Sequence, residues 1–178
     1  MRSLREFKGT RMQWIQPRAM VRHHELWSAQ ELYASLDWVQ LLGSLAEAST
    51  ADGTFTLKRG GFLLPYVTIR EKGSDADLAV LSMGMFRHGT LEFPNGRKIS
   101  LLSTRFWRLE WDLVDENGLT LCTISMNPTI LKHSADVTIS EIARRDRDLL
   151  LMVVIGWYTM VLVQQERAAA SSSAAGSY

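Results

Sequence analysis

Apolar and polar residues alternate in short runs over residues 12–139, and this period of two is typical of β-strands that bury one face. The clearest run, residues 107–113, alternates large apolar side chains with charged ones. Residues 31–38 follow the same pattern, with Ala34 and Leu36 on the predicted inner face. No helical spacing is sustained in this region, so the pattern predicts a mainly β chain.

Turn signals divide the same region into short segments. Asp52-Gly53, Asn95-Gly96 and Asn117-Gly118 are dipeptides that tolerate the positive φ angles of tight hairpin turns. No sequence repeat of fixed period recurs, which disfavours a propeller or a solenoid. The breaks predict about twelve strands, near residues 12–17, 22–28, 31–39, 42–49, 53–59, 62–71, 77–83, 89–94, 97–103, 107–115, 119–126 and 134–139.

Residues 149–163 form a different kind of segment, because they carry no charge and have no preferred polar face. As a strand the segment would extend about 50 Å, whereas as a helix it would span about 22 Å, so a helix is favoured. Ser140, or Thr138 with Glu141 three residues later, is the predicted helix cap. The predicted helix therefore covers residues 140–165, approximately.

A helix that is apolar all round must be surrounded, either by protein or by lipid. A closed barrel of about twelve strands has a bore about one helix wide, so we predict a closed antiparallel β-barrel that encloses one C-terminal hydrophobic α-helix. Gly156 in that helix would permit close approach by a strand or a ring. The alternative is a tail-anchored membrane protein, in which residues 149–163 form a short transmembrane helix beside the basic residues Arg144, Arg145 and Arg147.

Three stretches of the sequence resemble a known superfamily. They are the segment from Leu149 through Gly156-Trp157-Tyr158, the hairpin Phe93-Pro-Asn-Gly-Arg97 and the aromatic run Trp107-Arg-Leu-Glu-Trp111. With the twelve short strands, they make residues 12–165 similar to the tubby C-terminal-like superfamily of tubby proteins, phospholipid scramblases and LURP-one-related proteins, and most of all to its uncharacterised bacterial members.

This resemblance implies a barrel threaded by its last helix. Tubby domains bind phosphoinositide head groups, and scramblases are associated with calcium and membranes. The sequence has no segment that matches the basic lipid-binding motif of tubby proteins, and no acidic loop with the spacing of calcium ligands. No site residue is therefore carried over from the superfamily.

Length and composition indicate one domain without a strong charge bias. The 178 residues suffice for a single domain at residues 12–166, preceded by a basic arm at residues 1–11 and followed by a disordered Ala/Ser tail at residues 167–178. A net charge of +1 lacks the positive field of a typical nucleic-acid-binding protein, so no nucleic acid is expected. No apolar run of signal-peptide length follows the N-terminus, so the expected location is the cytoplasm.

Residue types that perform catalysis or bind metals form no recognisable constellation. His23 and His24 are adjacent and would point to opposite faces of a strand, so they cannot chelate one metal ion together. The single cysteine, Cys122, lies in an apolar run and is expected to be packed in the core. Thr90 stands where a phosphate-binding loop requires lysine. We therefore expect no enzymatic activity, no metal and no cofactor.

Six basic residues fall at or near strand ends, where side chains of neighbouring loops can converge on an anionic group. They are Lys58, Arg59, Arg70, Lys72, Arg97 and Lys98. The sequence thus suggests a non-enzymatic binding or scaffold domain that recognises an anionic lipid head group or a protein partner. Any membrane contact would be peripheral, unless residues 149–163 form the tail anchor.

Overall fold

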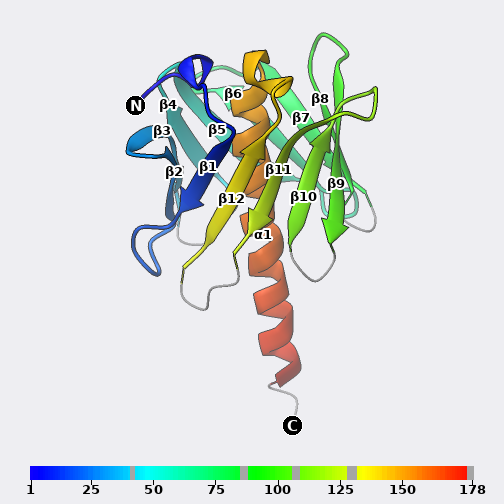
Figure 1. The fold of residues 1–178 in the computed structure, drawn as a ribbon. Coiled ribbons are helices and arrows are strands. Elements are labelled where there is room, and N and C mark those ends of the chain that lie inside the picture. The colour runs from blue at the N-terminus through cyan, green and yellow to red at the C-terminus, as the bar shows by residue number, and fades with distance from the viewer. Residues whose placement is uncertain (41–42, 85–87, 106–108, 128–131, 176–178) are drawn as a thin grey trace.

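The computed structural model, which describes residues 1–40, 43–84, 88–105, 109–127 and 132–175, is a β-barrel around a helix (Figure 1). Within these residues, twelve antiparallel strands form a closed barrel in which consecutive strands pair and β1 also pairs with β12. Closure gives each of these strands two partners, so none of them is an open sheet edge. The strands are β1 (Arg11–Ile15), β2 (His23–Ser28), β3 (Glu31–Trp38), β4 (Ala46–Thr50), β5 (Gly53–Gly60), β6 (Tyr66–Glu71), β7 (Asp77–Met83), β8 (Gly89–Glu92), β9 (Lys98–Arg105), β10 (Glu110–Val114), β11 (Thr120–Met126) and β12 (Ser134–Ile139).

The helix α1 (Leu149–Ala175) runs through the middle of the barrel and emerges at its lower end in Figure 1. Residues 152–161 are all buried, so this part of the helix forms the centre of the hydrophobic core. Trp157 stacks on Trp14 of β1, with ring centroids 5.9 Å apart and ring planes inclined by 10°. The predicted closed barrel around a hydrophobic C-terminal helix is confirmed.

The alternating pattern decides which strand residues face the helix. On β10, Trp111 and Leu113 are fully buried, whereas Asp112 accepts a hydrogen bond from the Thr123 hydroxyl on β11. The start of this predicted run, residues 107–108, lies outside the described residues. Period-two patterning thus places an apolar lining around α1.

The helix begins later than predicted. Residues 140–148 form a connection with the 3₁₀ turn η3 (Ala143–Arg145), and Ser140 Oγ accepts a hydrogen bond from Ala143 N over 3.3 Å. Ser140 therefore bonds to the first residue of this short turn, whose N-cap position is Ile142, and does not cap α1. The long helix starts at Leu149, whose backbone N–H donates to the carbonyl of Asp146.

Both ends of the chain are more structured than the composition predicts. Residues 1–11 do not form a free arm, because Leu4 of the 3₁₀ turn η1 (Leu4–Glu6) and Phe7 are buried against the core. At the other end, α1 continues through Ala175 into the expected disordered tail of residues 167–178. The alanines of this region explain the continuation, because alanine has the highest intrinsic helix propensity.

Two strands begin four residues later than predicted. The strand expected at residues 62–71 begins at Tyr66, because Gly61 adopts a φ of +73° and turns the chain after β5. Similarly, β4 begins at Ala46 instead of residue 42, and residues 41–42 lie outside the described residues. The first difference converts a predicted strand segment, residues 62–65, into a loop.

By length and composition, Leu149–Ser171 of α1 is apolar enough to cross a membrane. In the folded protein, 72% of the apolar window within it is buried. The barrel wall thus supplies the surroundings that such a helix needs.

Candidate functional site

The barrel has two ends, which receive different connections. We call the end at which α1 leaves the barrel the lower end and the end at which α1 starts the upper end, as they are drawn in Figure 1. Because the strands are antiparallel, successive connections alternate between the ends. The lower end receives the segments that follow the odd-numbered strands, and the upper end receives those that follow the even-numbered strands.

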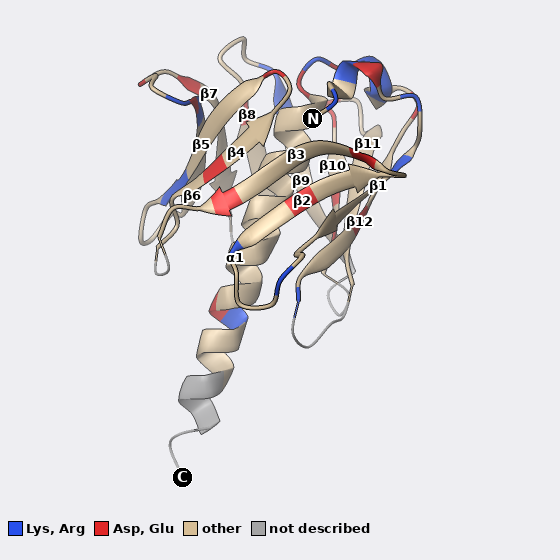
Figure 2. Ribbon diagram, turned by 90° about the vertical axis from the view of Figure 1, so that its left-hand side faces the viewer, with Lys and Arg blue, Asp and Glu red and all other residues tan. Residues whose placement is uncertain are grey.

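Acidic residues are distributed unequally between these connections. The described residues of the lower segments include no Asp or Glu; they are residues 16–22, 39–40, 43–45, 61–65, 84, 88, 109, 127 and 132–133. The upper segments contain Asp52, Asp75, Asp115, Glu116, Glu141, Asp146 and Asp148. Figure 2 shows charges of both signs gathered near the N-terminus at the upper end. An anionic surface would therefore meet less repulsion from the lower connections than from the upper ones.

Large apolar side chains are exposed mainly at the lower end. Phe62, Leu63 and Leu64 are 97%, 87% and 79% exposed in the loop between β5 and β6. Other exposed apolar residues of the lower end are Met20, Val21, Val39 and Tyr66. Among the described residues, those exposed at the upper end are Met1, Leu119 and Ile142. The lower end therefore carries most of the exposed large apolar side chains among the described residues, three of them consecutive in one loop.

The apolar loop, residues 61–65, is held in a tight turn. A Cβ atom at Gly61 would collide with the carbonyl oxygen of Leu64, and the positive φ angle there also favours glycine. At the other end of the loop, the carbonyl of Pro65 accepts a hydrogen bond from Met83 N over 2.9 Å, which attaches the loop to β7. The turn at Gly61 and the hydrogen bond at Pro65 thus bracket the three exposed apolar residues.

The six basic residues predicted from strand ends are not brought together. Four lie at or near the upper end, namely Arg70, Lys72, Arg97 and Lys98, and two lie near the lower end, namely Lys58 and Arg59. Five of them form ion pairs: Arg59 with Glu166, Arg70 with Asp77, Lys72 with Glu47, Arg97 with Asp146 and Asp148, and Lys98 with Glu92. Antiparallel strands end alternately at opposite rims, so strand-end position alone does not define one site.

Arg97 is fastened to the connection that precedes α1. Its guanidinium binds Asp146 and lies 2.9 Å from Asp148 Oδ2, while its charge lies over the Phe93 ring at 5.7 Å. Burial would raise the pKa of Asp146, but hydrogen bonds from Arg97 outweigh it and hold that pKa below its ordinary value. These contacts give Arg97 a structural role at the upper end.

The single thiol and the possible metal ligands of the described residues do not form a reactive arrangement. Cys122 is buried, and burial raises the pKa of its thiol to about 12, so the thiol stays protonated at neutral pH. Among the described residues, no three His, Cys, Asp or Glu side chains gather as metal ligands. Among the described residues, the lower end stands out by its exposed apolar side chains.

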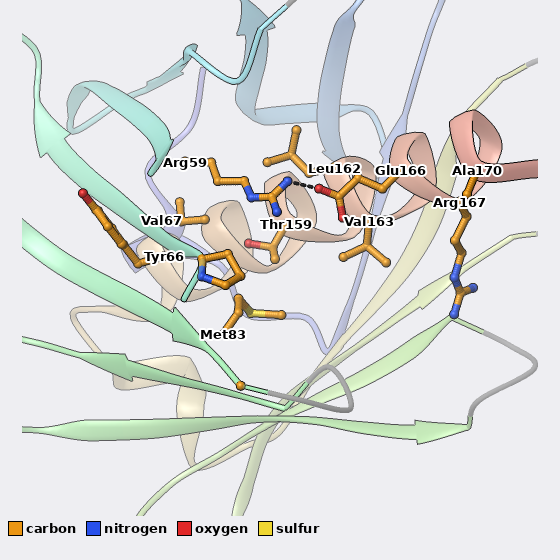
Figure 3. Close-up of a pocket in the computed structure, with 12 residues that line it drawn as sticks. Arg59, Tyr66, Val67, Met83, Thr159, Leu162, Val163, Glu166, Arg167 and Ala170 are labelled. Carbon is orange, nitrogen blue, oxygen red and sulfur yellow. Dashed lines mark ion pairs between the residues drawn. The ribbon is translucent and has the colours of Figure 1, made fainter. Parts of the chain in front are cut away.

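A cleft of about 300 Å³ lies at the lower end, between α1 and the strands β5 to β7 (Figure 3). Val67 and Met83 line it from the barrel wall, and Val163 lines it from the helix. The ion pair between Arg59 and Glu166 joins the wall to the helix beside it. Most of the lining is apolar, and three charged residues, Arg59, Glu166 and Arg167, complete it.

Sequence reasoning located neither the apolar loop nor the cleft. Gly60-Gly61 and Pro65 bracket three consecutive apolar residues, which is a detectable loop signal, but period-two patterning merged those residues with β6. The cleft combines wall residues such as Val67 with Val163 of α1, and no local pattern predicts such a distant juxtaposition.

No family model, curated protein or solved structure matches the chain, so the resemblance to the tubby C-terminal-like superfamily stays a prediction from the sequence.

Proposed function

We propose that this protein is a non-enzymatic binding module that docks on an anionic membrane surface through the lower end of its barrel. The observation that carries the proposal is the apolar loop, whose three exposed side chains lie on the end with acid-free connections. In this proposal the protein is cytoplasmic and its membrane contact is peripheral.

The apolar loop supplies a hydrophobic contribution to docking. Transfer of Phe62, Leu63 or Leu64 from water to an apolar environment is worth about 1.5–3 kcal/mol per side chain when burial is complete. Gly61 and Pro65 already define the backbone, so little ordering free energy is lost on binding. A lipid surface accepts apolar tips in any arrangement, whereas a protein partner would need a matching pocket for each of them.

Charge adds a second contribution. Arg18 is exposed on the connection after β1, and a basic side chain near an anionic membrane is worth about 1 kcal/mol. Residues 168–171 of α1, which follow Arg167, are uncharged. One hydrophobic and one electrostatic contribution together make binding stable where either alone is marginal.

The enclosed position of α1 supports peripheral docking over the tail-anchor alternative. A transmembrane role for residues 149–163 would require this segment to leave the barrel, although residues 152–161 are buried there. Its departure would remove the centre of the hydrophobic core, including the stacked pair of Trp14 and Trp157. The peripheral mode keeps that core intact.

Vesicle sedimentation tests the proposal. The full chain should sediment with vesicles that contain phosphatidylglycerol and weakly or not at all with vesicles of phosphatidylcholine alone. The triple variant Phe62→Ser, Leu63→Ser and Leu64→Ser should lose about tenfold or more in apparent affinity, because it removes the apolar contribution. The matched control, Leu119→Ser with Ile142→Ser, changes exposed apolar residues at the upper end and should bind like wild type.

Charge is tested separately with a second matched pair. Arg18→Gln should weaken binding and reduce its salt dependence, whereas Lys98→Gln at the upper end should not. Absence of binding to anionic vesicles at low salt would reject membrane docking and leave a protein partner as the explanation of the apolar loop. Carbonate-resistant association of the full chain with membranes would instead favour the tail anchor.

A further inference from the structure

We infer that the cleft between α1 and the strands β5 to β7 binds the single acyl chain of an amphiphile whose acidic head group meets Arg59. The inference deepens the proposed function and rests on it for the source of the chain, a lipid of the docked membrane. The exposed side chains of Phe62, Leu63 and Leu64 do not line the cleft, so membrane docking and chain binding can be tested separately.

The lining favours an aliphatic chain over a polar ligand. Val67, Thr159 and Leu162 line the cleft and are at most 8% exposed, and Met83 adds a flexible thioether side chain. The hydroxyl of Thr159 donates to the carbonyl of Ile155 over 2.7 Å, so it is already satisfied within the helix. These buried residues offer apolar contact but no open hydrogen-bonding group for a sugar or a base.

The size of the cleft limits the ligand. A volume of about 300 Å³ lies at the lower end of the range for small-molecule pockets, which is about 300–1,000 Å³. One narrow chain suits this space better than the whole body of a two-chain lipid. The rest of a larger lipid would stay outside, in the membrane or in water.

An exchangeable ion pair stands beside the cleft. The side chains of Arg59 and Glu166 are 34% and 52% exposed, so their mutual attraction is screened by water and weak. A carboxylate or phosphate on the ligand can replace Glu166 as the partner of Arg59, because guanidinium groups bind both kinds of anion in bidentate fashion. The charge of Arg59 thus complements an acidic head group, while Glu166 competes with it.

The apolar loop leads directly into the cleft. Pro65 belongs to the loop and lines the cleft. The adjacent Tyr66 also lines it (Figure 3). When Phe62 to Leu64 are inserted in lipid, the cleft lies next to the surface from which a chain would enter. This continuity identifies membrane lipid as the source of the chain in the proposal.

A fluorescent fatty acid tests the inference without membranes. In vesicle-free buffer, cis-parinaric acid should bind wild-type protein saturably, with increased fluorescence, and unlabelled palmitate should displace it. Val163→Phe fills the cleft and should weaken binding about tenfold or more. Gln164→Phe makes the same kind of enlargement at the next position of α1, which does not line the cleft, and should leave binding unchanged.

Two further variants examine the head group. Arg59→Gln should weaken binding of palmitate more than binding of hexadecanol, which has the same chain but no acid. Glu166→Gln removes the competing carboxylate and should strengthen binding of palmitate. Melting curves of all variants are compared, and a Val163→Phe protein that melts like wild type but no longer binds the probe supports the cleft as the site.

A second assay separates the two possible sources of the acyl chain. It measures whether the protein takes up a parinaroyl phospholipid from vesicles that contain it. Uptake from these vesicles identifies membrane lipid as the source, whereas binding of the free acid alone identifies a soluble fatty acid. Failure of wild type to bind in both assays overturns the inference, as does equal loss in Val163→Phe and Gln164→Phe. Because vesicle sedimentation depends on the apolar loop, these outcomes are distinguishable from a failure of membrane docking.

Discussion

His23 and His24 are neighbours on β2, yet they lie on opposite sides of the barrel wall and their pKa values shift in opposite directions. His23 Nδ1 lies 2.6 Å from Asp37 Oδ1, and its Nε2 lies 3.1 Å from Glu25. His24 is 1% exposed, with its ring centroid 5.4 Å from those of Trp38 and Trp157. One imidazole is therefore surrounded by acids and the other by aromatic rings.

The buried histidine should make the protein sensitive to acid. Burial, followed by the positive charges of His133, His23 and Arg22, lowers the pKa of His24 to about 3. The unfolded chain then binds a proton near pH 6.5 that the folded chain does not, so stability is lost as pH falls from about 6.5 toward 3. His24→Phe keeps a ring but cannot titrate, and should reduce the slope of unfolding free energy against pH by up to about 1.4 kcal/mol per unit.

The measurement is urea unfolding at several pH values, with His23→Gln as the matched variant on the other face. Burial alone would lower the pKa of His23, but hydrogen bonds to Glu25 and Asp37 raise it. Its stabilisation is therefore fully present below pH 6.5 and is lost as pH rises through its folded pKa. Equal slopes for wild type and His24→Phe below pH 6.5 would contradict the assignment of the acid sensitivity to His24.

Gly156 allows the barrel wall to approach α1. A Cβ at this position would lie 2.7 Å from Ile124 Cδ1 and 3.6 Å from Leu113 Cδ1. Gly156→Leu should therefore destabilise the protein by about 1–3 kcal/mol through overpacking. Gly156→Ala is milder, because one Ile124 methyl group can move and because alanine favours the helix by about 1 kcal/mol.

A double-mutant cycle isolates this contact. Ile124→Val deletes the Cδ1 methyl group that opposes Gly156, so Gly156→Ala should be more favourable in that background than in wild type. Chemical denaturation of the four proteins gives the coupling free energy. Strict additivity of the two substitutions would mean that Ile124 does not limit the space at Gly156.

Much of the fold could be predicted because its determinants are local. Alternating residues such as Trp111 and Leu113 identify the inner face of β10, and Asn117-Gly118 marks the turn to β11, where Gly118 has a φ of +80°. The uniformly apolar segment at residues 149–163 demands an enclosing structure, and a barrel of this size provides one. In these cases a short stretch of sequence is enough to predict the structure that its residues adopt.

The surface could be predicted less well, because exposure depends on neighbours that a short window does not contain. Phe62 to Leu64 look like part of a buried strand, but the turn at Gly61 leaves them in solvent. Likewise, Arg59 and Arg97 both lie near strand ends, and the topology places them at opposite ends of the barrel. The tertiary fold, and not the residue type, decides which of these side chains are exposed and which lie close together.

The ion pair of Arg97 with Asp146 should contribute measurably to stability. The two side chains are 27% and 12% exposed, so removal of one partner leaves a poorly hydrated charge on the other. Arg97→Gln should cost about 1–3 kcal/mol, measured by chemical denaturation at neutral pH. Lys98→Gln, whose pair with Glu92 is about half exposed on both sides, should change stability by less than about 1 kcal/mol.

The loss of unfolding free energy in Arg97→Gln should also depend on pH. The pKa of Asp146 is held below its ordinary value, so its stabilising charge is present above its unfolded pKa and is lost as pH falls through the folded pKa. The difference between wild type and Arg97→Gln should accordingly shrink in acid. A difference that stays constant down to low pH would assign the role of Arg97 to packing on Phe93 and not to charge.

Gly61 connects the stability of the apolar loop to membrane docking. Gly61→Ala places a Cβ against the Leu64 carbonyl, whereas Gly73→Ala, also at a positive φ of +89°, meets nothing within 4 Å. Both substitutions carry the cost of a left-handed alanine, about 1–2 kcal/mol, but only the first must displace the loop. Gly61→Ala should therefore destabilise the protein more than Gly73→Ala and should alone weaken sedimentation with anionic vesicles. If both variants sediment like wild type while Gly61→Ala is the less stable, docking does not depend on the shape of the loop, and exposure of Phe62 to Leu64 alone accounts for it.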